Sequence, residues 1–466
     1  MSLRATPTAR ALALGLRLPV VLLVMMLPFA LSAQDLTTPL LTDSWQATFS
    51  NPALYGQQRG SLTIGLLGVQ NDFYADNVTY NQLLLNEDDR RILDLNRLPA
   101  LLSDRNEIGN DFALETLGLG LRGERLSVGI YHRVRATGEA DYPRTLVELV
   151  AGGNAPFIGQ TIEVAPFGYA TGYHELALGL SYAVSERVHL GGRIKYLSGS
   201  ADLRIGTDAS LQLTTGEENY ALTLDQRLTL NSAGTVTYNG LDDVAFNYDA
   251  DPFGSNGLFS GNNGLAFDAG AFVDLDRVRL QAAANDLGAR IRWENEVQNF
   301  TLSGTETFSG IDVLDRIFQD SLSFTDALDS LEATFEPTVT AGGYESRIGA
   351  TYLIGGEFDV TERLTAGLLV VHYDRINAPE TALALNARYR FGNWLSVGLN
   401  YNARRGSNAN FGGQLLANIG AVQLLASTDN LLTVLNQKDN TRASVRLGMA
   451  LAFGRGAPDT DTIPTE

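Results

Sequence analysis

A short turn followed by a strand of alternating polarity recurs along this chain, and this repeat constrains the fold more than any other feature. Gly123–Gly129 reads GERLSVG, Ser185–Gly191 reads SERVHLG and Thr361–Gly367 reads TERLTAG. Each copy stands between two segments in which apolar and polar residues alternate, and a period of two is the geometry of a β-strand. The repeated unit is therefore predicted to be an antiparallel β-hairpin with a tight polar turn.

The alternation is clearest in Leu176–Val184, where one face carries Leu, Leu, Leu, Tyr and Val and the other only Ala, Gly and Ser. A soluble β-sandwich also alternates. A membrane barrel is favoured because the strands are long, the aromatic residues gather near strand ends, and short turns alternate with long insertions. We predict an all-β fold: a transmembrane antiparallel β-barrel of roughly fourteen strands with long extracellular loops.

The chain divides into four predicted parts. Residues 1–33 resemble a cleavable signal peptide, because a basic start is followed by the apolar run Leu18–Ala30 and by the small residues Ser32 and Ala33. A single membrane anchor is the alternative. Residues 34–58 are predicted to form a plug, residues 59–453 the barrel, and residues 454–466 a disordered acidic tail.

Three long insertions interrupt the hairpin rhythm, at Thr79–Phe112, Thr137–Tyr173 and Asn295–Arg347. Helical spacing of apolar residues predicts a helix within Val313–Leu331, and Leu83–Leu102 is a candidate for a second helix. The stretch 201–248 is rich in Thr, Asp, Asn and Gly and is interpreted as longer strands that project beyond the membrane.

Composition excludes several classes of function. The chain has no cysteine, so disulfides and thiolate metal sites are excluded. The formal charge is -19, and removal of the three arginines of the signal makes it three units more negative, which argues against nucleic acid as a partner. Lys195 and Lys438 are the only lysines, so almost every cation is an arginine, the residue suited to fixed ion pairs.

The segment Trp45–Leu54 is too apolar for a linker and too short for a domain. Its Asn51-Pro52-Ala53 resembles the Asn-Pro-Ala segment near the start of FadL-type outer-membrane proteins, the family of the long-chain fatty acid transporter. The resemblance implies a fourteen-stranded barrel with this segment inside it as a plug. The residues expected to form the plug are Trp45, Phe49, Asn51, Pro52 and Ala53.

Cationic side chains at inward positions are the best functional candidates. A buried guanidinium without a partner is costly, so these groups either pair with carboxylates of the plug or face a watery path that attracts anions or acidic peptide segments. They also argue against an apolar pocket for a fatty acid. The predicted lumen-lining residues are Arg122, Arg133, Arg135, Arg193, Lys195, Arg388, Arg390 and Arg446.

Other motifs have simpler interpretations. Gly118–Gly123 matches the dinucleotide fingerprint, but a strand and not a helix follows, so lumen-facing glycines are preferred. The histidines lack metal-ligand spacing, and a hydrolase pairing of His189 with Ser127 has no visible third residue. The four aspartates between 242 and 251 lack the spacing of a calcium loop. We predict no enzyme activity, no catalytic or metal site and no cofactor.

The sequence thus predicts an exported protein of the outer membrane of a Gram-negative-type cell. Its expected partners are outer-membrane lipid and the barrel-assembly machinery, together with a small-molecule solute or a secreted protein. The favoured function is a transport or pore protein for small polar or amphipathic solutes. The alternative is a non-transporting barrel that serves secretion or surface attachment of other proteins.

Overall fold

The computed structural model describes residues 36–87, 90–93, 97–218, 220–238, 244–246, 258–308, 337–376, 379–405, 407–431 and 440–454. The predicted signal peptide, the helix expected within Val313–Leu331, the four aspartates between 242 and 251, and the acidic tail beyond 454 lie outside the described residues.

Fourteen antiparallel strands of the described chain form one closed ring. The ring order is the chain order of these strands. They are β1 (Leu62–Ala75), β4 (Arg105–Arg122), β5 (Leu126–Pro143), β7 (Phe167–Ala183), β8 (Val188–Ile205), β13 (Asn263–Leu275), β14 (Val278–Trp293), β18 (Thr351–Asp359), β19 (Leu364–Tyr373), β20 (Glu380–Phe391), β21 (Leu395–Arg404), β22 (Ser407–Ile419), β23 (Val422–Thr428) and β24 (Arg442–Phe453).

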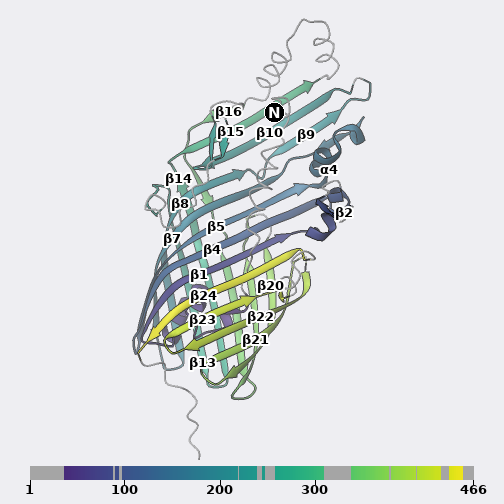
Figure 1. Ribbon diagram of the computed structural model, residues 1–466. Coiled ribbons are helices and arrows are strands. Elements are labelled where there is room, and N and C mark those ends of the chain that lie inside the picture. The colour runs from purple at the N-terminus through teal and green to yellow at the C-terminus, as the bar shows by residue number, and fades with distance from the viewer. Residues whose placement is uncertain are drawn as a thin grey trace, which may run out of the picture.

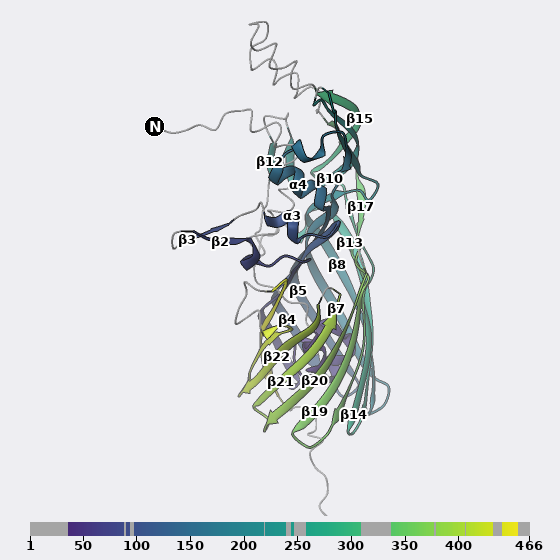
Figure 2. The ribbon, with the colours of Figure 1, turned by 90° about the vertical axis from the view of Figure 1, so that its right-hand side faces the viewer.

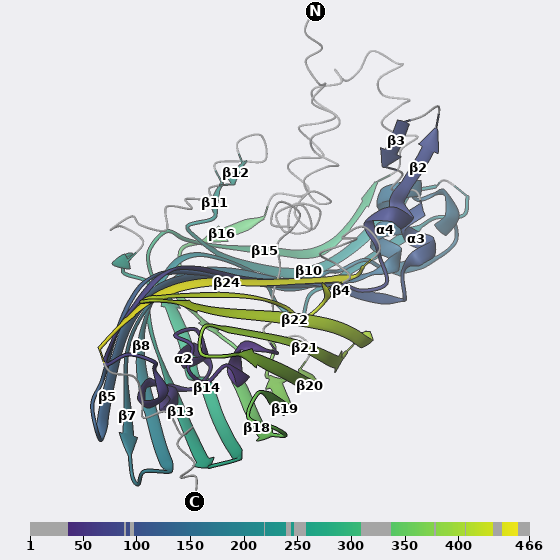
Figure 3. The ribbon, with the colours of Figure 1, turned by 60° about the horizontal axis from the view of Figure 1, so that its bottom comes forward.

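Closure comes from the first and last strands. Leu62 of β1 lies opposite Phe453 of β24, and the same residue lies opposite Leu121 of β4 on its other side. Every ring strand therefore has two partners, which satisfies its backbone hydrogen bonds without an edge in lipid. The predicted barrel and its number of strands are confirmed, and Figures 1 and 3 show the ring from the side and from the short-turn end.

The two faces of the wall differ as the alternation predicts. Leu176, Leu178 and Leu180 of β7 are exposed on the outer face, whereas Ala177 and Ser181, at the alternate positions, are buried in the lumen. Exposed aromatic side chains gather near the short turns, as expected where lipid meets water. They include Tyr182, Phe358, Tyr389, Phe391, Trp394 and Phe453.

Within the described residues, the long insertions contain regular structure. Parts of the first two continue the ring strands outward, because β4, β5, β7 and β8 stay paired along 17 or 18 residues. Shorter strands widen this extension at the end opposite the short turns (Figures 1 and 2). They are β6 (Thr161–Glu163), β9 (Ser210–Thr215), β10 (Leu222–Ala233), β15 (Val297–Phe308), β16 (Thr338–Thr340) and β17 (Tyr344–Arg347).

Small elements complete the described chain at that end. The candidate helix at Leu83–Leu102 is wrong as a prediction for most of this range. The segment instead contains η3 (Tyr80–Leu83), a hairpin of β2 (Leu84–Glu87) and β3 (Arg90–Leu93), and the short helix α3 (Leu98–Leu101). The remaining elements are α4 (Arg144–Gly152), η5 (Ala155–Phe157), β11 (Val236–Tyr238) and β12 (Val244–Phe246). Within the described residues, the helices are all too short or too polar to cross a membrane.

Candidate functional site

Residues 36–58 lie inside the barrel, at the end that carries the short turns (Figure 3). The segment folds into η1 (Thr38–Leu40), α2 (Ala47–Ser50) and η2 (Pro52–Gln57). Polar residues of this segment are as buried as its apolar ones, since Gln46 and Thr48 are both fully enclosed. We call residues 36–58 the luminal segment.

Glycines of the wall make room for the large side chains of the luminal segment. A Cβ at Gly65 or at Gly118 would lie 2.1 or 2.2 Å from an atom of the Trp45 indole, and a Cβ at Gly120 would lie 2.9 Å from it. Only glycine permits this approach. The GxGxxG match is therefore part of a socket for Trp45 rather than a nucleotide site.

A second socket holds Tyr55. Cβ atoms at Gly129 and Gly179 would lie 2.1 and 2.4 Å from the ring of Tyr55. The two sockets lie side by side, because the Trp45 and Tyr55 rings are 6.2 Å apart between centroids. Together they bury two aromatic side chains and fix the segment against β1, β4, β5 and β7.

The Asn51-Pro52-Ala53 motif caps a helix of the luminal segment and also contacts the barrel wall. The Asn51 Oδ1 accepts a hydrogen bond from the Ala53 backbone N–H at 3.0 Å, which caps η2, and Pro52 occupies the first position of that helix. The Asn51 Nδ2 donates to the Ala271 carbonyl in the wall at 3.0 Å. The wall residue Gly191 has no side chain, and a Cβ there would lie 2.2 Å from the Ala53 backbone nitrogen.

Substitution of Gly118 by alanine is expected to destabilise the protein, because its new Cβ collides with the Trp45 ring. Overpacking of this kind costs about 1–3 kcal/mol. Gly192→Ala is the matched control, because the nearest atom to its Cβ is 3.9 Å away. Urea unfolding of the folded barrel in lipid vesicles measures the difference; equal midpoints for both variants would contradict the socket.

Two of the predicted lumen cations, Arg193 and Lys195 of β8, lie in the centre of a buried charge network. The Arg193 Nη1 is 2.9 Å from the Asp268 Oδ2, and the Lys195 Nζ is 2.8 Å from the Asp268 Oδ1. The Lys195 Nζ is also 2.8 Å from an oxygen of Asp286. Asp268 on β13 thus pairs with two cations that have no exposed side-chain surface.

Arg133 and Arg135 of β5 extend the same network. Arg133 donates two hydrogen bonds to the carboxylate of Glu175, each 3.0 Å long. Arg135 lies 2.8 Å from Asp286 and 3.5 Å from Glu175. The network formed by Arg133, Arg135, Glu175, Arg193, Lys195, Asp268 and Asp286 is called the central charge network below.

Arg388 and Arg446 form separate ion pairs. Arg388 is 2.7 Å from Glu357, and Arg446 is 2.6 Å from Glu115. The last two predicted cations lie near the short turns: Arg122 at the lower end of β4 is half-buried, and Arg390 near the end of β20 donates to the Glu362 carbonyl at 2.9 Å.

The partner carboxylates come from the wall and not from the luminal segment. The arginines hold that segment through its backbone carbonyls instead: Arg388 donates to Leu40 at 3.2 Å and Arg446 contacts Gln46 at 3.4 Å. Arg193 donates to the carbonyls of Thr48 and Phe49. The expectation of pairing with plug carboxylates is therefore wrong, because the segment offers oxygen atoms through its main chain.

Directly beyond the luminal segment the lumen opens into a recess with about 1140 Å³ of empty space, the inner recess. Pro39, Phe49 and Ser50 form its floor. Its wall combines the charged groups of Arg133, Arg135 and Asp286 with aromatic and aliphatic side chains. The latter are Phe112, Tyr169, Ile348, Leu353, Val371 and Tyr373.

The histidines do not form a catalytic arrangement with the serine considered for them. Ser127 pairs with Ser181 across β5 and β7, and the Ser181 hydroxyl donates to the Ala53 carbonyl at 2.8 Å. The His189 ring lies 6.3 Å from the Phe272 ring, and the two ring planes are tilted by 55°. In the described residues there is no group of three or more possible metal ligands.

Sequence reasoning missed the acidic half of the site. The signal was present, because Glu175 precedes the outward Leu176 and Asp268 follows the outward Phe267, which puts both carboxylates on the inward parity. It also missed Arg375, which stands beyond the end of a strand, where alternation gives no guide.

This architecture defines a class: a membrane-spanning β-barrel whose lumen is filled at one end by its own N-terminal segment. The chain matches, over residues 52–429, a family described as a family of unknown function (DUF5723), and it belongs to that family. A comparison with curated proteins gives no match.

Solved structures of outer-membrane channels resemble the chain at low identity. The toluene transporter TodX of P. putida shares 10% identity with a TM-score of 0.41, over 87% of this chain and 93% of that one. A FadL homologue of Pseudomonas aeruginosa shares 11% identity with a TM-score of 0.38, over 88% and 94%. Toluene is named as the solute of TodX and not of this chain.

Proposed function

We propose that this protein is an outer-membrane transport barrel that passes small polar or amphipathic solutes when its luminal segment shifts. The observation that carries the proposal is the inner recess, one end of which is lined by Pro39, Phe49 and Ser50 of the luminal segment. A solute that enters from the wide end meets Phe49 and Ser50, and it continues only if they move.

The way the luminal segment is held supports a movable plug. Its main-chain oxygens accept hydrogen bonds from Arg193, Arg388 and Arg446, while each of these arginines keeps its own carboxylate partner in the wall. Displacement of the segment therefore leaves the cations paired. The cost of a buried charge without a partner, which would otherwise lock the plug, is avoided.

The lining of the inner recess supports the class of solute. Charged groups and aromatic rings share its wall, and binding sites for amphipathic small molecules combine apolar surface with a few placed polar groups. A long apolar chain is a poor fit, because Arg133, Arg135, Asp286 and Arg446 would have to be covered without a partner for their exposed atoms.

The test is solute uptake by vesicles that contain the mature protein or its Trp45→Ala variant. Loss of the indole empties the socket at Gly65 and Gly118, so we expect uptake of small polar solutes to rise severalfold. Trp394→Ala is the matched control, because that indole is exposed on the outer face. Equal uptake by all three proteins contradicts the proposal and favours the non-transporting barrel.

A further inference from the structure

Arg375 reaches into the lumen from a position two residues beyond the end of β19, and its side chain is almost fully buried. Its guanidinium lies near four carboxylates. The distances are 3.2 Å to Glu139 of β5, 3.5 Å to Asp111 of β4, 3.6 Å to Glu380 of β20 and 3.9 Å to Asp72 of β1.

These contacts cross the barrel. On one side of the ring β21 to β24 separate β20 from β1, and on the other side β7, β8, β13, β14 and β18 separate β5 from β19. A side chain that joins β19 to β4 and β5 therefore passes through the lumen. Arg375 forms a bar between opposite walls at the level of Asp72 and Glu139.

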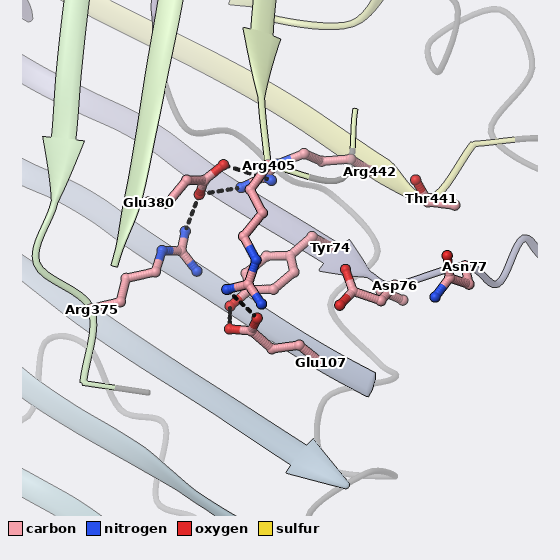
Figure 4. A pocket seen from close by; sticks show the side chains of 10 residues that line it. Tyr74, Asp76, Asn77, Glu107, Arg375, Glu380, Arg405, Thr441 and Arg442 are labelled. Atoms are coloured by element: carbon pink, nitrogen blue, oxygen red, sulfur yellow. Dashed lines mark hydrogen bonds and ion pairs between the residues drawn. The ribbon is translucent and has the colours of Figure 1, made fainter. Parts of the chain in front are cut away.

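The bar separates two spaces. On its outer side lies a recess with about 580 Å³ of empty space, lined by Tyr74, Glu107, Arg405 and Arg442 among others (Figure 4). On its inner side lies the inner recess, which continues down to the luminal segment. Among the described residues, Arg375 is the one that lines both spaces.

The aromatic rings and carboxylates around Arg375 would attract any cation at this position. Its guanidinium lies 4.6 Å from the Tyr74 ring centroid and 5.9 Å from that of Tyr373, within the range of cation–π attraction. Arg442 shares Asp72 and Glu380 with it, at 3.1 and 3.2 Å. Arg404 also lies 3.5 Å from Glu380. These three arginines stand among the four carboxylates Asp72, Asp111, Glu139 and Glu380, which leaves an excess of one negative charge.

The contacts of Arg375 are also looser than those of Arg388 and Arg446. Its carboxylate distances of 3.2–3.9 Å compare with 2.6 Å for Arg446 to Glu115 and 2.7 Å for Arg388 to Glu357. An incoming cation can take its place without leaving a carboxylate unpaired. A neutral or anionic solute offers no such exchange.

We propose that the Arg375 side chain is the gate between the two recesses, and that the carboxylates around it make the passage select solutes with a guanidinium or ammonium group. This proposal rests on the proposed transport function, and it narrows the solute class from polar or amphipathic to cationic. It also reverses the expectation that the lumen arginines attract anions, because the surplus charge at the gate is acidic.

The first test is charge selectivity, measured as a reversal potential in a KCl gradient with barrels that lack residues 36–55. Arg375→Ala is expected to raise the ratio of K⁺ to Cl⁻ permeability about fivefold, because one unit charge at roughly 7 Å in water changes the local concentration of each ion two- to threefold in opposite directions. Arg375→Lys keeps the charge and is expected to stay near the wild-type ratio.

Arg290→Gln is the matched control, because Arg290 is an exposed arginine paired with Glu345 at 2.8 Å, outside the lumen. A ratio for Arg375→Ala that equals those of the wild type and of Arg290→Gln overturns the gate. A total lack of current in every form that lacks residues 36–55 overturns the proposed transport function instead, and the second test then decides about Arg375 alone.

The second test needs no current. In the full mature chain, Arg375→Ala leaves a guanidinium-sized space among the carboxylates, so millimolar guanidinium chloride is expected to raise the temperature at which the folded barrel unfolds on a gel, relative to equal NaCl. The wild type and Arg290→Gln are expected to show no such rise. The absence of a guanidinium-specific rise in Arg375→Ala overturns the cation site.

Discussion

Deletion of residues 36–55 is expected to turn a barrel without steady current into one that conducts in steps. The luminal segment fills the lumen between the sockets on β1, β4, β5 and β7 and the contacts on β8, β13 and β24. A ring of fourteen strands is much wider than the eight-stranded barrels whose interior is filled by their own side chains. Without the segment, water is expected to fill the lumen.

Single-channel recording in planar bilayers measures this prediction, and we expect mean conductance to rise by an order of magnitude or more over the intact protein. The fold of the deleted form is checked by its heat-modifiable migration on a gel. Silence of a correctly folded deleted form would show that another part of the chain closes the barrel.

Asp268→Asn is expected to produce the largest loss of stability among single substitutions in the central charge network. Asp268 pairs with both Arg193 and Lys195, and none of the three side chains is exposed. Removal of one partner of a buried ion pair costs about 3–5 kcal/mol, because the remaining charge stays in a medium that solvates it poorly.

The matched control for this substitution is Asp276→Asn. Asp276 pairs with Arg187 at 3.1 Å, but both side chains are largely exposed, and pairs of that kind contribute about 0–1 kcal/mol. Urea unfolding in vesicles compares the two variants. A loss for Asp268→Asn no larger than that for Asp276→Asn would mean that water reaches the network.

Much of this fold follows from the sequence because a strand with lipid on one side must alternate. That rule places Leu176 and Leu178 outside and Arg193 and Lys195 inside, where the structure has them. The partners of these cations follow from the same parity. Which carboxylate meets which cation does not, because Asp268 and Arg193 lie 75 residues apart and meet only through the register of β8 and β13.

The luminal segment and the gate were harder to predict for a different reason. Gly65 and Gly118 are consistent with a turn or a bulge in sequence, and only the position of Trp45 in the lumen shows what they accommodate. Arg375 belongs to no alternating strand, so its burial is set entirely by tertiary contacts with Glu139, Asp111 and Glu380.

If the luminal segment moves to let solute pass, a reversible disulfide between this segment and the wall must stop transport. A Cβ at Gly448 would lie 2.8 Å from the Cγ of Gln46, close to the distance from a Cβ to the partner sulfur in a disulfide, and the chain has no other cysteine to interfere. The variant is Gln46→Cys with Gly448→Cys, and each single substitution is its control.

Uptake of a small cationic solute by vesicles is measured with this variant oxidised and then reduced. If the luminal segment moves during transport, oxidation is expected to abolish uptake and reduction to restore it. The single-cysteine variants are expected to respond to neither treatment. Equal uptake by the oxidised and reduced forms would contradict the proposal that the luminal segment must move, because solute would then pass a segment that cannot move.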